Sequence, residues 1–514
     1  MTSNIPLIAL AAAHGGRTAI IDSNGLYSYD DLLKASSRVA SGLLAGGVDL
    51  EEARVAFLVP SGFHHVATQW GIWRAGGVAV PIATTDTVPE IEYRIQDSRA
   101  SVVVAHPETA AVMRPIAAAM ARRFALTTDL LVTDETPLPA IETSRKAMIV
   151  YTSGTTSKPK GVVTTHTNVT AQVKTLVQAW EWTANDRIVN PLPLHHVHGI
   201  INVLSCAMWA GAVCEMVPKF SADKVWERLA SGDLSLYMAV PTTYKALIAF
   251  WEKAPPEQRK RMAEGCRKLR LMVSGSDSLP IDTFERWREI TGHTLLERYG
   301  MSEVGMARSN PLHGERIAGH VGRPLPGVQI RVVELDMAHF EETGAHRHGP
   351  EVTRDGTPGE IQIKGDNVFA EYWDRPEATA EAFTPDGWFC SGDIASLSNG
   401  NIRIWGRASQ DIIKSGGELV SAVEVQRVLK EHPDIEDCAV IGVKDAYWGK
   451  AVSAAVVLRN GKSITREAVR EWARDKLAPY KLPQKVVVVD ALPRNAMGKV
   501  IKPQLARLFD VGQA

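Results

Sequence analysis

The stretch from Met148 to Gly161 constrains the fold more than any other part of the sequence. It begins with Met148-Ile149-Val150-Tyr151, an apolar run with β-branched residues, and continues into a segment crowded with hydroxyls, glycines and lysines. This order predicts a strand that ends in a loop. Open α/β sheets bind ligands at the carboxyl ends of their strands, so we expect this loop to belong to a binding site.

The composition of the loop favours a phosphate ligand. Backbone N–H groups and hydroxyls in residues 152–156 can donate to phosphate oxygens, and Lys158 and Lys160 add positive charge. The loop is not a Walker loop, because Pro159 stands where the pattern counted from Gly154 needs a glycine. We therefore expect a nucleotide here, against the alternative of a polar surface loop.

Length and composition limit the class of protein. A chain of 514 residues is too long for one hydrophobic core, so two to four domains are expected. The net charge of −1 gives no field that would favour nucleic acid or an anionic membrane as a partner.

The sequence predicts a cytoplasmic location, because its five cysteines form no C-x-x-C pair and its start has no secretion signal. The apolar run from Gly199 to Val217 contains Asn202 and predicts a buried helix rather than a membrane span.

Strands and helices alternate in the first part of the chain. A cap at Ser28 predicts a helix that ends at Gly46-Gly47, and Asn168 predicts the start of another that continues to Trp180. Helical stretches such as 64–73 separate short β-branched runs, which cover residues 54–59, 77–81 and 101–105. This alternation indicates an α/β fold with a parallel sheet and helices on its faces.

The last quarter of the chain has a different character. Gly406-Arg407 opens a polar run that ends at Gly416-Gly417, and we place a domain boundary there. The predicted domains are residues 1–406 and 407–514, the second a small one of mixed α and β structure. Residues 330–356, rich in Glu, His, Thr and Gly, predict an irregular or hairpin insertion.

Two further segments carry side chains suited to catalysis or binding. His195, His196 and His198 could suggest zinc, but no cysteine or carboxylate lies at a usable spacing, so a packing or pocket-lining role is favoured. Arg298 and Tyr299 lie close to Glu303. An enzyme that uses ATP needs a ring for adenine, a cation for an acid and a carboxylate for Mg²⁺. The alternative is a strand end with a surface ion pair.

Taken in order, these motifs resemble the core motifs of the adenylate-forming superfamily, which includes acyl-CoA synthetases, luciferases and carrier-loading adenylation domains. The matching segments are 151–161, 196–199, 299–303, 391–393, 406–417 and 493–499. The resemblance spans essentially the whole chain. It implies a large N-terminal domain of layered sheets and helices and a small, mobile α+β C-terminal domain that rotates between two half-reactions.

Four segments are similar, more closely, to the malonyl-CoA synthetases: 194–199, 295–301, 322–328 and 412–417. That similarity implies ATP- and Mg²⁺-dependent ligation of malonate to coenzyme A through a malonyl-adenylate, with release of AMP and diphosphate. The alternatives are a ligase for methylmalonate or another short dicarboxylic acid, and an enzyme that loads a separate carrier protein.

The resemblance also implies a role for individual residues. Those expected to bind ATP are Thr152, Ser153, Gly154, Thr155, Thr156, Lys160, Ser274, Gly275, Ser276, Tyr299, Ser302, Asp393 and Arg407, with Glu303 and Thr152 on Mg²⁺. The acid would meet Arg298, His198 and Arg270, and coenzyme A would meet Lys414, Gly416, Gly417 and Gly449. Lys499, Arg298 and His196 form the expected catalytic set, in which Lys499 bridges the carboxylate and the α-phosphate. The hinge is expected at residues 408–410. Ser157, Asp277 and Glu418 depart from the family pattern.

Overall fold

The chain divides into two compact units. The computed structural model describes residues 4–152, 158–343, 346, 348–494 and 500–510. One unit comprises residues 1–330 and 363–389, and the other comprises residues 331–362 and 390–514. The predicted boundary after residue 406 falls inside the second unit, so it remains a proposal about which segment moves.

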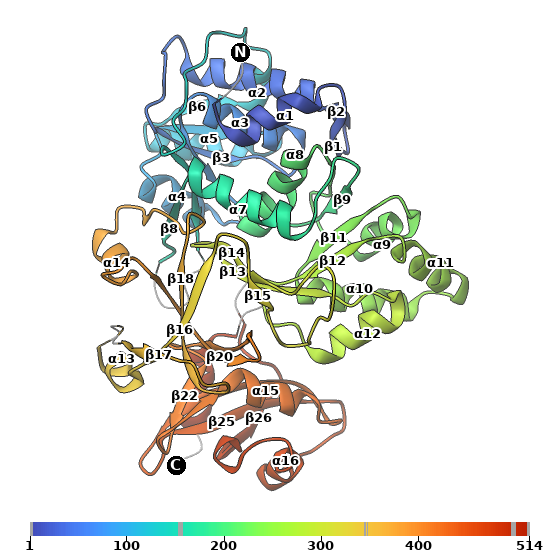
Figure 1. Ribbon diagram of the computed structural model, residues 1–514, viewed down its shortest axis with the longest axis vertical. Coiled ribbons are helices and arrows are strands. Elements are labelled where there is room, and N and C mark those ends of the chain that lie inside the picture. The colour runs from blue at the N-terminus through green and yellow to red at the C-terminus, as the bar shows by residue number, and fades with distance from the viewer. Residues whose placement is uncertain (1–3, 153–157, 344–345, 347, 495–499, 511–514) are drawn as a thin grey trace. The chain divides into compact units, whose positions relative to one another are not determined.

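Nine of the described strands form a largely parallel sheet in the first unit (Figure 1). Its central strands run parallel, and antiparallel strands close both edges. In spatial order they are β15 (Arg323–Pro324), β14 (Gly305–Ser309), β13 (Leu296–Met301), β12 (Leu271–Ser274), β11 (Leu236–Ala239), β9 (Arg187–Asn190), β10 (Val213–Met216), β1 (Thr18–Asp22) and β2 (Gly25–Ser28). Four helices bury apolar faces against it: α9 (Ala222–Ser231), α10 (Pro241–Lys253), α11 (Pro256–Cys266) and α12 (Ile281–Thr291). The stacked indoles of Trp226 and Trp287 lie in this core, 5.5 Å apart between ring centroids.

A second sheet in the same unit has seven described strands. In order they are β19 (Glu371–Tyr372), β8 (Gly161–Thr165), β7 (Lys146–Tyr151), β4 (Val78–Pro81), β3 (Arg54–Leu58), β5 (Val102–Ala105) and β6 (Arg123–Leu126). The α4 (Val88–Asp97) and α5 (Ala110–Ala119) helices pack against it. The strands from β7 to β6 run parallel, so their carboxyl ends lie along one edge. The predicted phosphate loop follows β7 at that edge.

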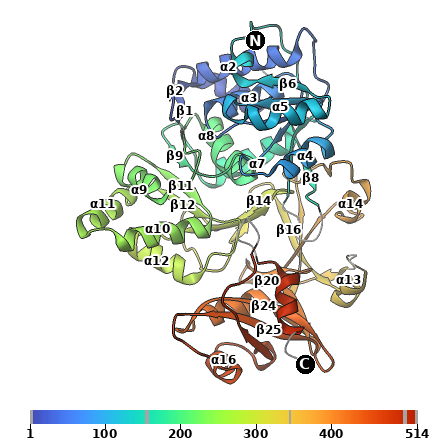
Figure 2. The same ribbon diagram turned by 180° about the vertical axis from the view of Figure 1, so that it is seen from behind.

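Further helices complete the first unit, and Figure 2 shows α2 and α3 side by side near its N-terminus. Their bounds are α1 (Pro6–Ala11), α2 (Tyr29–Leu44), α3 (Phe63–Arg74), α6 (Thr127–Leu131), α7 (His166–Ala179), α8 (Cys206–Ala210) and α14 (Pro376–Glu381). A π-helix, η3 (His198–Ser205), precedes α8. π-Helical turns are rare and often lie at functional sites.

The second unit contains two sheets, each with five strands among the described residues. One has the order β17 (His348–Glu351), β16 (Gln329–Leu335), β18 (Pro358–Lys364), β20 (Phe389–Ser398) and β21 (Asn401–Arg407), with α13 (Met337–Thr343) between β16 and β17. The other comprises β23 (Glu418–Ser421), β22 (Ile412–Ser415), β25 (Gly449–Leu458), β24 (Ile435–Asp445) and β26 (Lys485–Val488). Its faces are covered by α15 (Ala422–Lys430) with α16 (Arg466–Ala473) and by α17 (Lys502–Asp510).

Most predicted elements are confirmed, with two corrections. The α2 helix begins with a capping box between Ser28 and Asp31, as its sequence predicts. The α7 helix, however, is capped by Thr165, and Asn168 is its partner three residues later. The predicted helix over Gly199 to Val217 is wrong in its second half, because Gly211 ends α8 in the left-handed conformation and β10 follows. None of the described helices is long and apolar enough to cross a membrane.

Candidate active site

The predicted phosphate loop connects two antiparallel strands. Tyr151 at the end of β7 pairs with Gly161 at the start of β8, and the Thr152 N–H donates to the carbonyl of Lys160 at 3.0 Å. This pairing fixes Thr152 and Lys160 at the two ends of the loop. The predicted ligands Ser153, Gly154, Thr155 and Thr156, and the departure at Ser157, lie outside the described residues.

Tyr372 brings the cation and the carboxylate of the predicted ATP site together. The Lys160 Nζ atom lies 4.8 Å from the centroid of its ring. Its hydroxyl donates to Oε1 of Glu303 at 2.9 Å, and Glu303 is buried. Hard cations such as Mg²⁺ prefer oxygen ligands, so the Glu303 carboxylate and the Thr152 hydroxyl fit this ion.

The adenine residues lie around the ends of two neighbouring parallel strands. Ser274 ends β12 and pairs in register with Glu297 of β13. Tyr299 on β13 and Ser302 in the turn after it are partly buried. Ser274 is fully buried, and its hydroxyl has no hydrogen-bond partner among the described residues. The structure therefore places the predicted adenine residues Ser274 and Tyr299 on β12 and β13, and the predicted α-phosphate residue Ser302 in the turn that follows.

A chain of hydrogen bonds joins Arg298, Ser276 and His198. The Arg298 Nη2 atom donates to the Ser276 hydroxyl at 3.2 Å, and that hydroxyl lies 3.3 Å from Nδ1 of His198. Arg298 and His198 are 4% and 5% exposed, so both side chains are almost entirely removed from water. Glu297 has a different partner, since its Oε1 accepts from the Gly319 N–H at 2.9 Å, in keeping with the alternation of side chains along a strand.

This chain of bonds leaves two polar atoms unsatisfied. Because Arg298 donates to Ser276, the hydroxyl hydrogen is available to His198 Nδ1, and we infer that the imidazole proton lies on Nε2. Burial, with Arg298 and His196 nearby, places the pKa of His198 well below its usual value, so the ring is neutral. His198 Nε2 and Arg298 Nε are buried and have no partner in the part of the chain that the structure describes. Such orphaned donors point to a bound acceptor.

Burial also changes the pKa of the Arg298 guanidinium. It lowers the pKa of the guanidinium to about 9, so the group is still a cation at neutral pH but is poorly solvated. The backbone of Gly275 lies directly against it: a Cβ added at this glycine would be 2.5 Å from Arg298 Cζ. The buried guanidinium packs against the Gly275 backbone, and Arg298 Nε and His198 Nε2 are available as donors. This arrangement is suited to bind a carboxylate.

Arg270 does not join this group. It lies before the first residue of β12, whereas Ser274 and Gly275 lie at the other end of that strand. Its Nε and Nη2 atoms donate to the two carboxylate oxygens of Asp186 at 2.8 and 2.7 Å, and Nη1 donates to the Trp180 carbonyl. This bidentate pair occupies the guanidinium, so the prediction that Arg270 binds the acid is withdrawn.

His196 precedes the π-helix and is partly buried beside His195, with 4.4 Å between the ring centroids. Burial, together with His196, lowers the pKa of His195 to about 3. Gly199 packs so closely on the Pro193 carbonyl that a Cβ would lie 2.5 Å from its oxygen. The structure gives His196 a place at the entrance of η3, and its catalytic role stays a prediction.

Asp393 and Arg407 form an ion pair in the second unit. Arg407 Nε lies 2.8 Å from Asp393 Oδ1, and Arg407 Nη1 donates to the Ser391 carbonyl at 2.7 Å. The two residues are in register on the antiparallel strands β20 and β21. The predicted ribose-binding residues are thus brought together, with the carboxylate held in place by the guanidinium.

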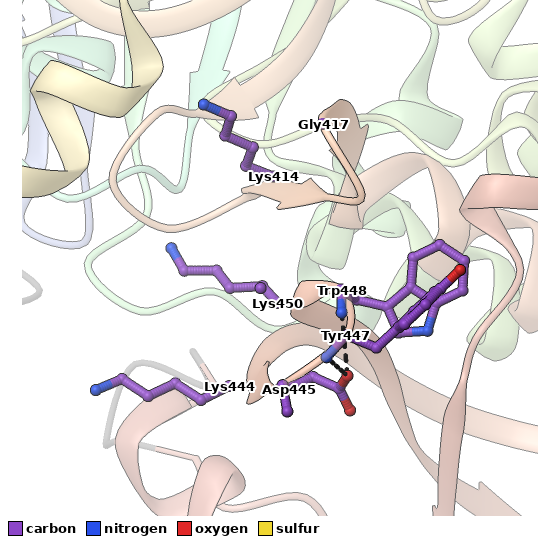
Figure 3. Close-up of a pocket in the computed structure, with 9 residues that line it drawn as sticks. Lys414, Gly417, Lys444, Asp445, Tyr447, Trp448 and Lys450 are labelled. Atoms are coloured by element: carbon purple, nitrogen blue, oxygen red, sulfur yellow. Dashed lines mark hydrogen bonds between the residues drawn. The ribbon is translucent and has the colours of Figure 1, made fainter.

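Three of the predicted coenzyme A residues, Lys414, Gly417 and Gly449, line a groove of about 920 Å³ in the second unit (Figure 3). Gly416 and Gly449 adopt left-handed φ angles of 58° and 72°, and the Gly416 N–H donates to the Trp448 carbonyl at 3.0 Å. Figure 3 shows the side chains of Lys414, Lys444 and Lys450 extending in one direction, away from Tyr447 and Trp448. Three cations along one groove are suited to bind a polyanion.

Sequence reasoning missed six residues that line this groove: Lys444, Asp445, Ala446, Tyr447, Trp448 and Lys450. Lys444 and Lys450 are paired on β24 and β25, on either side of the turn that carries the aromatic residues. The sequence pattern that could have identified them is a pair of lysines that flank Tyr447-Trp448 within seven residues.

Lys499, the predicted bridging lysine, lies outside the described residues.

Comparison with known proteins agrees with this geometry. A family model of AMP-binding enzymes matches residues 9–373, and a model of the AMP-binding enzyme C-terminal domain matches residues 424–499. The chain belongs to the AMP-binding enzyme family. In this family member the two matched regions leave a connecting segment, residues 374–423, that contains Asp393, Arg407 and the predicted hinge.

Three similar proteins match nearly the whole of this AMP-binding enzyme. The mitochondrial malonate–CoA ligase ACSF3 of Bos taurus is 44% identical over 526 residues, which cover 98% of this chain and 90% of that protein. ATP-bound MatB from Rhodopseudomonas palustris is 33% identical, with a TM-score of 0.86 and coverage of 98% of this chain and 99% of that one. A malonyl-CoA ligase solved with methylmalonyl-CoA and AMP is 31% identical, with a TM-score of 0.69 and coverage of 95% and 100%.

Proposed function

We propose that this AMP-binding enzyme is a malonate–CoA ligase that uses ATP to form malonyl-CoA, AMP and diphosphate. The observation that carries the proposal is the buried Arg298–Ser276–His198 group, with orphaned donors at Arg298 Nε and His198 Nε2. The names of the relatives give independent support.

The choice of acid follows from what the buried guanidinium requires. Malonate has a second carboxylate, which would pair with Arg298 and accept from Nε2 of His198. A monocarboxylic acid such as acetate leaves the buried cation unpaired, which costs several kcal/mol. A long chain would collide with the guanidinium. A short dicarboxylic acid is therefore selected by charge and by length together.

In the first half-reaction, a malonate oxygen attacks the α-phosphorus of ATP, and the bond from that phosphorus to the bridging oxygen of diphosphate breaks. Both reactants are anions, so positive charge must converge on them. Lys160 would hold the outer phosphates, and Lys499 would bridge the carboxylate and the α-phosphate. Tyr372 orients the Glu303 carboxylate for the magnesium ion, which when bound would neutralise phosphate charge. Asp393, held by Arg407, would accept hydrogen bonds from the ribose hydroxyls.

In the second half-reaction, the coenzyme A sulfur attacks the acyl carbon of malonyl-adenylate. The bond to the phosphate oxygen breaks, AMP leaves with the electron pair, and the thiol proton passes to solvent. We propose that residues 407–514 rotate about residues 408–410, with Ser409 as the pivot, between the two steps. This rotation would withdraw Lys499 and bring Lys414, Gly416, Gly417 and Gly449 to the thiol substrate. Glu418, at the start of β23, leaves an acidic side chain next to these glycines.

The first test is product formation across a panel of acids. We expect AMP formation with malonate to exceed that with acetate, propionate or butyrate by at least about 10²-fold, from the cost of an unpaired buried charge. Malonyl-CoA should accumulate only when coenzyme A is present. Equal activity with acetate and malonate would contradict the proposal, and oxygen-dependent light emission or loading of a carrier protein instead of coenzyme A would point to the rival activities.

Methylmalonate is a second candidate substrate, because the related ligase noted above was solved with methylmalonyl-CoA. It keeps both carboxylates and adds one methyl group. A difference of one methyl changes binding by only about 1–3 kcal/mol. Competition between malonate and methylmalonate at equal concentration measures that preference directly.

We also propose a cytoplasmic location for the enzyme. The Bos taurus relative is called mitochondrial, and cell fractionation would decide between a cytoplasmic and a mitochondrial location.

Gly275→Ala is expected to raise the KM for malonate about tenfold. The added methyl group would meet Arg298 Cζ at 2.5 Å, so the flexible guanidinium must move away from its place. A shifted charge-assisted hydrogen bond costs about 1.5 kcal/mol, or about a factor of ten. Initial rates at varied malonate and saturating ATP measure the effect. Gly16→Ala is the matched control, because a Cβ there meets nothing within 4 Å; an unchanged KM in Gly275→Ala would refute the packing argument.

The double variant Lys444→Glu/Lys450→Glu is expected to raise the KM for coenzyme A at least about tenfold, because reversing cations in a binding groove weakens anion binding. Malonyl-adenylate formation, followed as diphosphate release without coenzyme A, should keep its wild-type rate. The effect should shrink at high salt. Lys462→Glu, on an exposed turn of the same unit, is the control. A KM for coenzyme A that matches the control would exclude these lysines from the site.

A further inference from the structure

A group of nitrogen, sulfur and oxygen ligands lies in the second unit, on the sheet whose strand β20 also carries Asp393. One potential ligand atom from each of His346, His348, Glu360 and Cys390 lies within 4.8 Å of every other. His348 begins β17, Glu360 is on β18 and Cys390 is on β20 of one sheet. His346, His348 and Cys390 are 14, 12 and 30 residues from Glu360, and the order of strands in the sheet brings them together.

Glu360 is at the centre of the group and is fully buried. His346 Nδ1 lies 2.9 Å from its carboxylate, and His348 Nε2 is hydrogen-bonded to Oε2. The other oxygen, Oε1, accepts from the Gly392 N–H at 2.8 Å. The carboxylate thus contacts two imidazole nitrogens and one backbone N–H.

We propose that His346, His348, Glu360 and Cys390 bind a structural zinc ion. Two imidazoles, one carboxylate and one thiolate are the ligand types that zinc accepts in four-coordinate sites. Tetrahedral zinc with bonds of about 2.0–2.3 Å needs ligand atoms about 3.3–3.8 Å apart, which the observed cluster reaches with small side-chain shifts. Neither the phosphate loop nor the acid pocket contributes a ligand.

The charges of the four ligands balance that of a divalent cation. Zinc with one carboxylate, one thiolate and two neutral imidazoles gives a site of zero net charge, which suits its buried position. Binding releases the thiol proton of Cys390 to solvent, and each neutral imidazole coordinates through the nitrogen that faces Glu360 while its proton lies on the other ring nitrogen. No oxidation or reduction is involved.

Neighbouring groups already orient the ligands. Gln362 Nε2 donates to Cys390 Sγ at 3.7 Å, and Gln362 Oε1 accepts from Arg331 Nε at 2.7 Å. The Phe340 ring meets His346 edge-on, with 5.2 Å between centroids. Such outer contacts hold metal ligands in their binding geometry. Glu360 also accepts a hydrogen bond from the Gly392 N–H. Zinc bound to Glu360 would therefore stabilise the sheet next to Asp393.

Zinc content and cobalt spectra test this proposal. Full-length protein without a histidine tag is incubated with equimolar zinc, desalted and analysed by elemental mass spectrometry. We expect about one zinc ion per chain in the wild type and in the control His313→Gln, whose imidazole is exposed and paired with Glu181. His346→Gln/His348→Gln should retain less than a tenth of that amount. Equal retention by this variant, or none by the wild type, would overturn the proposal.

Cobalt substitution tests the thiolate without depending on the histidine variants. Wild-type protein loaded with Co²⁺ should show a thiolate-to-metal charge-transfer band, and Cys390→Ser should lose it. A wild-type spectrum without that band, or a band that persists in Cys390→Ser, would reject Cys390 as a ligand and with it the proposed site. The zinc-loaded wild type should also melt at a higher temperature than the chelator-treated protein, because binding to the native state stabilises it.

Discussion

Replacing Arg298 by glycine is expected to reduce kcat/KM for malonate on the order of 10²–10³-fold. The guanidinium is 4% exposed, and it donates to Ser276 while its Nε has no partner among the described residues. Removing one member of a buried charge pair costs about 2–5 kcal/mol, which corresponds to this range. Diphosphate release at saturating ATP and varied malonate measures the loss. The KM for ATP should change little, because Arg298 is assigned to the acid and not to the nucleotide.

The same variant gives a sharper result when the substrate is changed as well. Propionate lacks the distal carboxylate, so it loses nothing when Arg298 is removed. The ratio of malonate to propionate activity should fall towards one in Arg298→Gly, and it should stay at its wild-type value in Arg267→Gly, a change at an exposed arginine that ends α11. Unchanged malonate turnover in Arg298→Gly would end the specificity argument, whereas equal losses for both acids would indicate a structural role.

Replacing Lys499 by alanine is expected to slow malonyl-adenylate formation on the order of 10²–10³-fold, by analogy with the loss of one preorganised donor from an oxyanion hole. Lys499 lies outside the described residues, so this prediction rests on the sequence motif and on the proposed function. Thioester formation from supplied malonyl-adenylate should be largely retained, because the lysine is needed only where negative charge develops on the carboxylate and α-phosphate. The two half-reactions are measured separately, as diphosphate release and as malonyl-CoA formation.

Lys476→Ala is the control for that variant, because it removes an exposed lysine from the same unit. It should leave both half-reactions unchanged. Normal adenylate formation by Lys499→Ala would remove the lysine from the catalytic set. Loss of both half-reactions would instead indicate damage to the fold of the C-terminal region, which circular dichroism and a melting curve would detect.

Local patterns predicted the elements well, because short-range chemistry determines them. The Ser28 and Asp31 side chains that cap α2 are three residues apart, and the alternation that separates Arg298 from Glu297 needs only an extended strand. The strand and loop at 146–161 could be recognised for the same reason. Asn168 was misplaced as a cap because Thr165 and Asn168 cap reciprocally, and either can be taken for the first residue.

Contacts between distant residues could not be predicted in this way. Arg270 was grouped with the acid pocket because its partner, Asp186, is 84 residues away, and no local signal connects them. Ser276 lies 78 residues from His198, so the hydrogen bond that sets the imidazole tautomer appears only in the fold. The histidines of 346–348 were placed in an irregular insertion, and their meeting with Cys390 depends on the order of strands in the sheet.

The close packing of Gly275 under Arg298 also limits the routes by which this enzyme could change its substrate during evolution. A side chain at position 275 displaces the guanidinium, so it costs malonate binding while the arginine is present and costs nothing of that kind once the arginine has been lost. A lineage that moves towards neutral acids therefore loses less activity when Arg298 changes first and position 275 then fills the vacated space. We therefore expect the two substitutions to be epistatic, so that laboratory evolution towards monocarboxylic acids acquires them mainly in that order.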